Sequence, residues 1–298
     1  MFYLPARRAV HFTMSVALSN PREYAALAVA AEESGYHQIA VPDSVFWSES
    51  VSNAYPYTKD GSRLWTEQTD FVDPFVACAS MAAVTSRIRF LTHVVKVAVR
   101  NPILLAKQIS SVAVLSDNRF TFGAGVGWLK EEFEWSGGVY EGRGKYTDES
   151  LDAIVALLTG DWVERDGDLV RFGRIKQPPA PTERVPIWVG GHTPVALRRT
   201  ARFGDGWTSA MMGIEEFREV RGTLLDLLQA AGRPTDGFAF QIAPNDRFGL
   251  EGYKELAEAG VTDVVTVPWL FYGVPWDGPV EDKLYGIRRF AKEVIEAW

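Results

Sequence analysis

Short runs of β-branched and aromatic residues alternate with longer amphipathic stretches along the whole of this 298-residue chain. This alternation is typical of repeated βα units, whose strands lie parallel in one sheet. Between the strands lie helical patterns such as residues 21–35, where Pro21 suits a first turn and Gly35 a C-terminal cap. The predicted strands number eight, at residues 10–17, 37–42, 88–96, 119–124, 185–190, 206–210, 238–243 and 263–267. Eight such units favour an α/β fold of the closed (β/α)8 type, the TIM barrel, over an open doubly wound sheet.

Length and composition are consistent with one domain over residues 1–298. Barrels of this type routinely reach about 250 residues or more without splitting. The chain is 47% hydrophobic and 23% charged, as ordinary globular proteins are. No internal repeat or low-complexity linker indicates a second domain.

Charge and hydropathy exclude several classes of partner. The net charge is −7, and lysines and arginines are scattered singly, which argues against nucleic-acid binding. The first ten residues hold two arginines, but the following residues are too polar for a signal peptide, and no 18-residue apolar run occurs. We therefore expect a soluble cytoplasmic protein that does not enter membranes. The single cysteine, Cys78, lies in an apolar run and is predicted to be a buried, inert thiol.

Three connections are longer than usual and predict insertions after strands 2, 4 and 8. They are Asp43–Asp73, residues 160–184 and Val267–Pro279. The second contains Asp166-Gly167 between two alternating runs, which indicates a β-hairpin. The first and third follow strands and therefore belong to the catalytic face of a barrel. Both are rich in aromatic residues, so we predict a pocket for a flat, apolar small molecule, lined by Tyr55, Trp65, Trp269 and Tyr272.

Motif searches narrow the chemistry. None of the four histidines forms a metal-binding pair, so no metal site is expected, and the sequence motifs of serine hydrolases and P-loop NTPases are absent. Gly123–Trp128 is interpreted as a tight turn after strand 4. Gly190 and Gly191 end strand 5 just before a helix capped by Thr193, where free N–H groups attract an anion such as a cofactor phosphate. An ordinary strand-to-helix turn is the alternative.

Six segments together resemble one family in their order along the chain. They are IAVPDSVFW, IRFLTHVVKVAVRNPILLAKQ, RFTFGAGVGWLKEEF, RGKYTDESLDAI, VPIWVGG and ARFGDGW. The chain resembles the luciferase-like monooxygenase superfamily, particularly its branch that uses the deazaflavin coenzyme F420. The resemblance implies the barrel fold, a flavin-type cofactor, and a homodimer formed through helices on the side of the barrel.

The resemblance also implies cofactor-binding residues. Asp43 matches an acidic residue that touches the cofactor ring, Trp47 lies at or beside a ring-facing tryptophan, and Gly190 with Gly191 match glycines near the phosphate. Arg143 resembles a phosphate-binding arginine of the FMN branch. Relatives also place a non-proline cis peptide bond facing the ring, which here falls between His93 and Val94.

Two departures from the family pattern bear on mechanism. Ser44 stands where F420-dependent sugar-phosphate dehydrogenases have a catalytic histidine, and Val126 stands where they have a catalytic glutamate. Val126 also replaces a phosphate-binding arginine of bacterial luciferase. Catalytic residues are therefore left unassigned; His93, Glu131 and Tyr55 are conceivable proton donors.

The expected function is hydride transfer between coenzyme F420 and an apolar small molecule. An FMN-dependent monooxygenase of the same fold is the first alternative, and a non-catalytic flavin-binding protein is the second.

Overall fold

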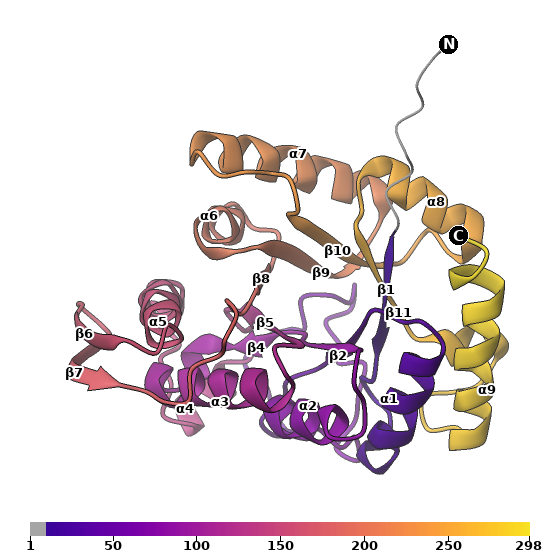
Figure 1. Cartoon of the computed structure of the whole chain (residues 1–298), viewed down its shortest axis with the longest axis horizontal. Coiled ribbons are helices and arrows are strands. Elements are labelled where there is room, and N and C mark those ends of the chain that lie inside the picture. The colour runs from indigo at the N-terminus through magenta and orange to yellow at the C-terminus, as the bar shows by residue number, and fades with distance from the viewer. Residues whose placement is uncertain (1–9) are drawn as a thin grey trace.

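Parallel strands close into a barrel in the computed structural model, which describes residues 10–298 (Figure 1). The predicted (β/α)8 fold is confirmed. Neighbouring strands pair in the order β3-β2-β1-β11-β10-β9-β8-β5, and pairing of β3 with β5 closes the ring. The third barrel strand has two segments, because residues 93 and 94 interrupt it between β3 and β4. The strands are β1 (His11–Ser15), β2 (Gln38–Val41), β3 (Arg89–Thr92), β4 (Val95–Lys96), β5 (Phe120–Gly125), β8 (Ile187–Gly190), β9 (Gly206–Met212), β10 (Ala239–Pro244) and β11 (Asp263–Thr266).

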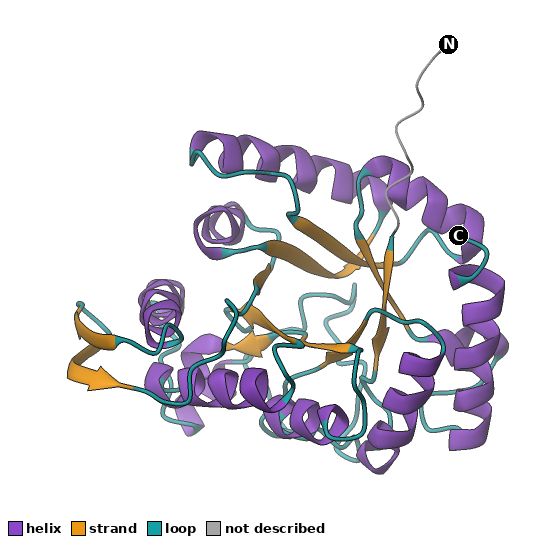
Figure 2. Ribbon diagram, viewed as in Figure 1, coloured by secondary structure: helices purple, strands orange, loops and turns teal. Residues whose placement is uncertain are grey.

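Helices surround the barrel on its outside (Figure 2). Three of them begin with the same signal, in which a polar side chain accepts hydrogen bonds from first-turn N–H groups and proline follows it. These caps are Asp73, Asn101 and Thr193. The helices are α1 (Tyr24–Glu33), α2 (Pro74–Ala82), α3 (Pro102–Leu115), α4 (Lys130–Trp135), α5 (Arg143–Leu157), α6 (Pro194–Phe203), α7 (Ile214–Ala230), α8 (Gly249–Ala259) and α9 (Val280–Phe290).

A large apolar core fills the space between strands and helices, and it includes Cys78, whose pKa is raised by burial as expected of an inert thiol. A polar chain crosses the barrel interior. The amide of Gln241 donates to the Thr13 hydroxyl (3.0 Å), and the Thr208 hydroxyl donates to the Gln241 carbonyl (2.7 Å). His93 contacts Thr208 through Nε2 at 2.9 Å. This chain joins four barrel strands beneath the site described below.

Three insertions interrupt the regular pattern, as expected. The loop between β2 and α2 holds no helix or strand. A 3-10 helix (Pro268–Tyr272) follows β11. The predicted hairpin is confirmed as antiparallel β6 (Trp162–Asp166) and β7 (Arg171–Lys176), which lie beyond α5 and away from the barrel (Figure 1). Helix α4, directly after β5, was not predicted from the sequence.

Within residues 10–298, no helix is both long and apolar enough to span a membrane. The expectation about a signal peptide depends in part on residues 1–9, which lie outside the described residues.

Candidate active site

A cavity of about 1310 Å³ opens at the C-terminal ends of the barrel strands. Its lining comes from the segments that follow β1, β2, β5, β8, β9, β10 and β11, together with β4. Pockets for drug-sized ligands usually measure about 300–1,000 Å³. The cavity is therefore large enough for a cofactor and a second molecule, and it lies on the face that carries catalysis in this fold.

Val94 lies between two glycines in the cavity wall. A Cβ on Gly125 would approach a Val94 methyl to 2.6 Å, and one on Gly190 to 3.3 Å, so both glycines make room for this side chain. The peptide bond between His93 and Val94 is cis, which confirms the prediction. Burial lowers the pKa of His93 to about 4, so this imidazole is neutral at physiological pH.

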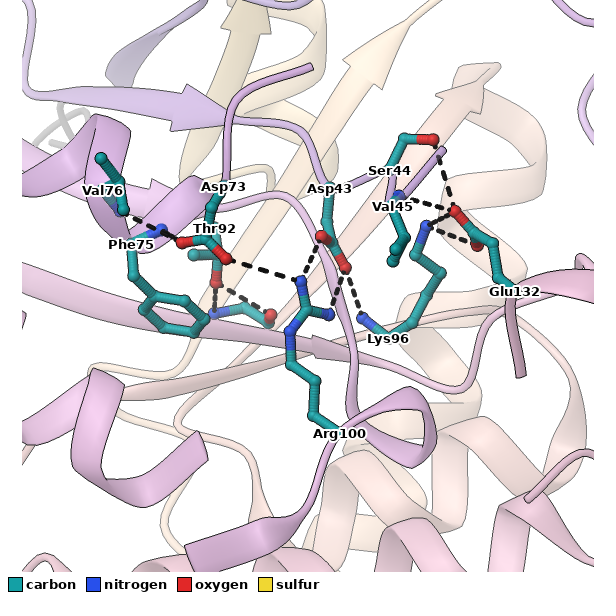
Figure 3. A network of polar contacts seen from close by, with 11 residues as sticks. Asp43, Ser44, Val45, Asp73, Phe75, Val76, Thr92, Lys96, Arg100 and Glu132 are labelled. Atoms are coloured by element: carbon teal, nitrogen blue, oxygen red, sulfur yellow. Dashed lines mark hydrogen bonds and ion pairs between the residues drawn. The ribbon is translucent and has the colours of Figure 1, made fainter. Parts of the chain in front are cut away.

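Asp43 lines the cavity, but its carboxylate is occupied by the protein itself (Figure 3). Arg100 donates to both of its oxygens, at 2.7 and 2.8 Å, and the Lys96 backbone N–H adds a third bond at 3.1 Å. Burial alone would raise the pKa of Asp43; the charges of Lys96 and Arg100 outweigh it and hold this pKa below its usual value. Asp43 thus fastens the start of the β2 insertion to the third barrel strand.

A second buried ion pair lies beside it (Figure 3). Lys96 Nζ lies 2.7 and 2.6 Å from the two carboxylate oxygens of Glu132 on α4. The same carboxylate accepts bonds from the Val45 N–H (2.9 Å) and the Ser44 hydroxyl (3.3 Å). Lys96 and Glu132 both line the cavity, with side-chain exposures of 9% and 1%.

The glycine turn and Arg143 line the same cavity, as a phosphate site requires. Gly191 has a φ of +109°, a conformation that L side chains rarely adopt, and its carbonyl accepts a bond from Trp207 Nε1 at 2.8 Å. Arg143 opens α5; its guanidinium lies 4.1 Å from the centre of the Tyr140 ring and donates to two backbone carbonyls. Among the described residues no carboxylate pairs with Arg143, so its charge is available to an anion.

Aromatic rings form one wall of the cavity. The Tyr55 ring packs edge-on against Tyr57, Trp65 and Trp128, with centroids 5.1–5.4 Å apart. Burial raises the pKa of Tyr55 to about 12, so its phenol is neutral at physiological pH. Tyr55 and Trp65 thus lie where the sequence placed them.

Four other residues singled out from the sequence lie elsewhere. Trp47 is outside the cavity lining, and Arg63 stacks on its ring at 3.2 Å. Trp269 is fully buried in the core, while Tyr272 donates a hydrogen bond to Glu293 away from the cavity. Glu131 accepts bonds from Ser52 instead of facing the cavity. The predicted pocket roles of Trp269 and Tyr272 are therefore corrected: this loop contributes Leu270, Phe271 and Trp276 to the lining instead.

Sequence reasoning missed Lys96, Arg100 and Glu132. All three lie in segments that were quoted for the family resemblance, but nothing in a single sequence shows which charged side chain points inward. Arg100 lies 57 residues from its partner Asp43, a distance over which no local pattern operates.

Comparisons with known proteins agree with this architecture. A family model described as luciferase-like monooxygenase matches residues 2–245. An uncharacterised protein of Mycobacterium tuberculosis is 36% identical over 289 residues, which cover 96% of this chain and 99% of that protein. An F420-dependent glucose-6-phosphate dehydrogenase of Gordonia bronchialis is 29% identical over 206 residues, covering 66% of this chain but only 55% of that protein.

The fold also matches a solved structure over nearly its whole length. The coenzyme F420-dependent tetrahydromethanopterin reductase from Methanopyrus kandleri superposes with a TM-score of 0.74 at 17% identity, covering 97% of this chain and 99% of that one. The family match, the barrel and the cavity lead to one conclusion. The chain belongs to the luciferase-like monooxygenase family and is an oxidoreductase.

Proposed function

We propose that this protein transfers hydride between coenzyme F420 and an apolar small molecule. The observation that carries the proposal is the composition of this cavity, which combines a corner suited to an anion with an extended aromatic wall. Such a cavity suits a ligand that has a phosphate at one end and a planar ring system at the other. The F420-dependent relative from Gordonia bronchialis supports the deazaflavin form of the cofactor.

The residues present fit such a cofactor. Gly191 lacks a Cβ where the backbone would approach a phosphate, and Arg143 offers on the same cavity a guanidinium that pairs with no carboxylate of residues 10–298. Gly190, Val94 and Gly125 lie together in the cavity wall, where the ring of the cofactor would bind. When bound, the cofactor would supply or accept the two electrons and the hydrogen at carbon. The protein's own residues would bind it, orient the substrate against it and exclude water.

The second substrate would occupy the aromatic side of the cavity. Tyr55, Trp65 and Trp128 offer apolar ring surface, and the neutral Tyr55 phenol can hydrogen-bond without adding charge. Phe271 and Trp276, from the loop after β11, complete the apolar lining. An uncharged, ring-sized molecule suits this wall best.

Arg143 also supports a second candidate, an FMN-dependent monooxygenase. In this reading the guanidinium would bind the FMN phosphate, in agreement with the resemblance to the FMN branch. The two candidates differ in their use of oxygen, because a monooxygenase consumes it in proportion to product, whereas hydride transfer proceeds without it.

Anaerobic turnover distinguishes the candidates. Purified protein would be mixed with reduced F420 and a panel of apolar acceptors, and the reappearance of the oxidised cofactor's absorbance followed. We expect turnover with at least one acceptor and no dependence on oxygen. Strict dependence on oxygen with FMN would favour the monooxygenase, and a stable complex that never turns over would favour a binding protein.

A further inference from the structure

Lys96 lines the cavity and is paired with a buried carboxylate, Glu132. It ends β4, opposite Gly125 of β5, at the C-terminal end of the third barrel strand. Residues in this position of a barrel point toward the catalytic face. Its side chain is 9% exposed and lines the cavity, while the side chain of its partner Glu132 is buried.

The turn after β5 is shaped around the Lys96 stem. Gly127 has a φ of +82°, and a Cβ there would lie 2.9 Å from Lys96 Cγ and 2.7 Å from the Phe133 ring. Glu132 then holds the ammonium, and is itself fixed by the Val45 N–H and the Ser44 hydroxyl. Three segments therefore position one amine.

A buried ion pair is an expensive way to stabilise a fold, since well-packed apolar residues often do as well. The neighbouring Asp43–Arg100 pair has a mechanical purpose, because it joins the β2 insertion to the barrel through two parallel hydrogen bonds. Lys96 also contacts both oxygens of its partner, but unlike Arg100 it lines the cavity.

Two other proton donors of the cavity, His93 and Tyr55, are poorly suited to give up a proton. His93 is neutral and bonded to Thr208, and the Tyr55 phenol has a pKa of about 12. His192 also lines the cavity, but its side chain is 38% exposed and its Nδ1 lies 3.7 Å from Glu216. Arg63, Arg143 and Arg199 also line the cavity, but a guanidinium does not deprotonate in proteins. Among the described lining residues, Lys96 is the one ammonium.

We propose that Lys96 is a catalytic residue that binds the oxygen of a carbonyl substrate and protonates it, with Glu132 as its positioning residue. The inference rests on the proposed hydride transfer. When a carbonyl is reduced, hydride from the reduced deazaflavin adds to carbon with both electrons. The C=O π pair moves to oxygen, which takes a proton from Lys96 Nζ to give an alcohol. The resulting neutral amine regains its proton from water.

A probe that needs no cofactor tests whether the positive charge of Lys96 acts on a ligand oxygen in the cavity. Para-nitrophenol ionises near neutral pH and changes colour, so its absorbance in the presence of protein reports whether the cavity prefers phenol or phenolate. We expect the phenolate to bind at least about tenfold tighter, equivalent to a pKa lowered by one unit. Lys96→Met/Glu132→Gln, which removes both charges and keeps an acceptor for Val45, should abolish the preference.

Three further variants make the test specific. Lys130→Met removes an exposed cation from α4, the helix that carries Glu132, and should leave the phenolate preference intact. Lys96→Arg keeps the charge without a transferable proton; it should keep the preference but lower turnover of a carbonyl acceptor at least about a hundredfold, within the usual contribution of general acid catalysis. Oxidised cofactor should bind this variant as it binds the wild type.

Three results would overturn the proposal: no phenolate preference in the wild type, including no binding at all; loss of the preference in Arg143→Gln but not in the double variant; or full turnover in Lys96→Arg. The probe needs no cofactor, so it separates failure of this inference from failure of the F420 assignment. A protein that prefers FMN could still show the phenolate preference.

Discussion

Replacing Asp43 by asparagine should destabilise the fold sharply. The Asp43 side chain is 1% exposed, and both carboxylate oxygens accept bonds from Arg100, whose side chain is 15% exposed. Asparagine keeps one acceptor oxygen and turns an NH2 group toward the guanidinium, whose remaining ion-pair partner is the Asp73 carboxylate, 4.0 Å away. Removing one partner of a buried pair costs about 3–5 kcal/mol.

The free-energy change converts into a measurable shift in melting temperature. At about 2.1 cal/mol/K per residue, the unfolding entropy of 298 residues is about 0.6 kcal/mol/K, so the loss corresponds to about 5–8 °C in Tm. Differential scanning calorimetry would measure it at pH 7. Asp168→Asn is a matched control, because that aspartate is 79% exposed in its pair with Lys145 and should not shift Tm measurably.

The same variant has a predicted pH dependence. The folded-state pKa of Asp43 lies below its ordinary value of 3.8, so the carboxylate's contribution is complete above pH 3.8 and is lost as pH falls through the folded-state pKa. The difference between wild type and Asp43→Asn should therefore persist at neutral pH and shrink in strong acid. A folded Asp43→Asn protein with an unchanged Tm at pH 7 would refute the clamp.

Three other predictions concern the cavity. Gly191→Val should weaken cofactor binding more than about tenfold in a fluorescence titration, whereas Gly237→Val, with a similar positive φ but no near neighbour, should not; equal effects would locate the phosphate elsewhere. Burial lowers the pKa of His93 to about 4, so below pH 6.5 the unfolded state binds a proton that the folded state does not. The free energy of unfolding should therefore fall by about 1.4 kcal/mol per pH unit between pH 6.5 and about pH 4. Urea unfolding should show this slope reduced in His93→Gln, and an unchanged slope would contradict it. Tyr55→Ala should raise the KM of the apolar substrate severalfold while Tyr272→Phe should not, and the reverse order would contradict the aromatic wall.

The eight βα units and the position of the cavity could be predicted from the sequence because they depend on periodicity, which is repeated along the chain, and the count of eight favoured a closed barrel. The alternation of β-branched runs and amphipathic stretches shows which residues of each segment are buried. Because active sites of this fold lie after the barrel strands, the same pattern also predicts where the cavity lies. Asp43 was found through the family resemblance, and it lies just after the buried strand β2, where functional residues of this fold lie.

Side-chain direction was harder to predict. In the loop after β11, a short 3-10 helix buries Trp269 and places Phe271 on the cavity. No local signal in this aromatic-rich stretch shows which of its rings point inward and which point toward the cavity. Glu131 and Glu132 present the same problem on α4, since adjacent helical residues point about 100° apart. Glu132 reaches Lys96, while Glu131 turns to Ser52.

The F420 assignment is tested most directly by one equilibrium titration. Apoprotein purified free of cofactor would be titrated in parallel with oxidised F420 and with FMN, with cofactor fluorescence as the signal and Arg143→Gln as a check that the phosphate corner is engaged. We expect a lower Kd for F420 than for FMN, and weaker binding of F420 by the variant. A lower Kd for FMN would contradict the deazaflavin assignment and make the monooxygenase the better account of this cavity.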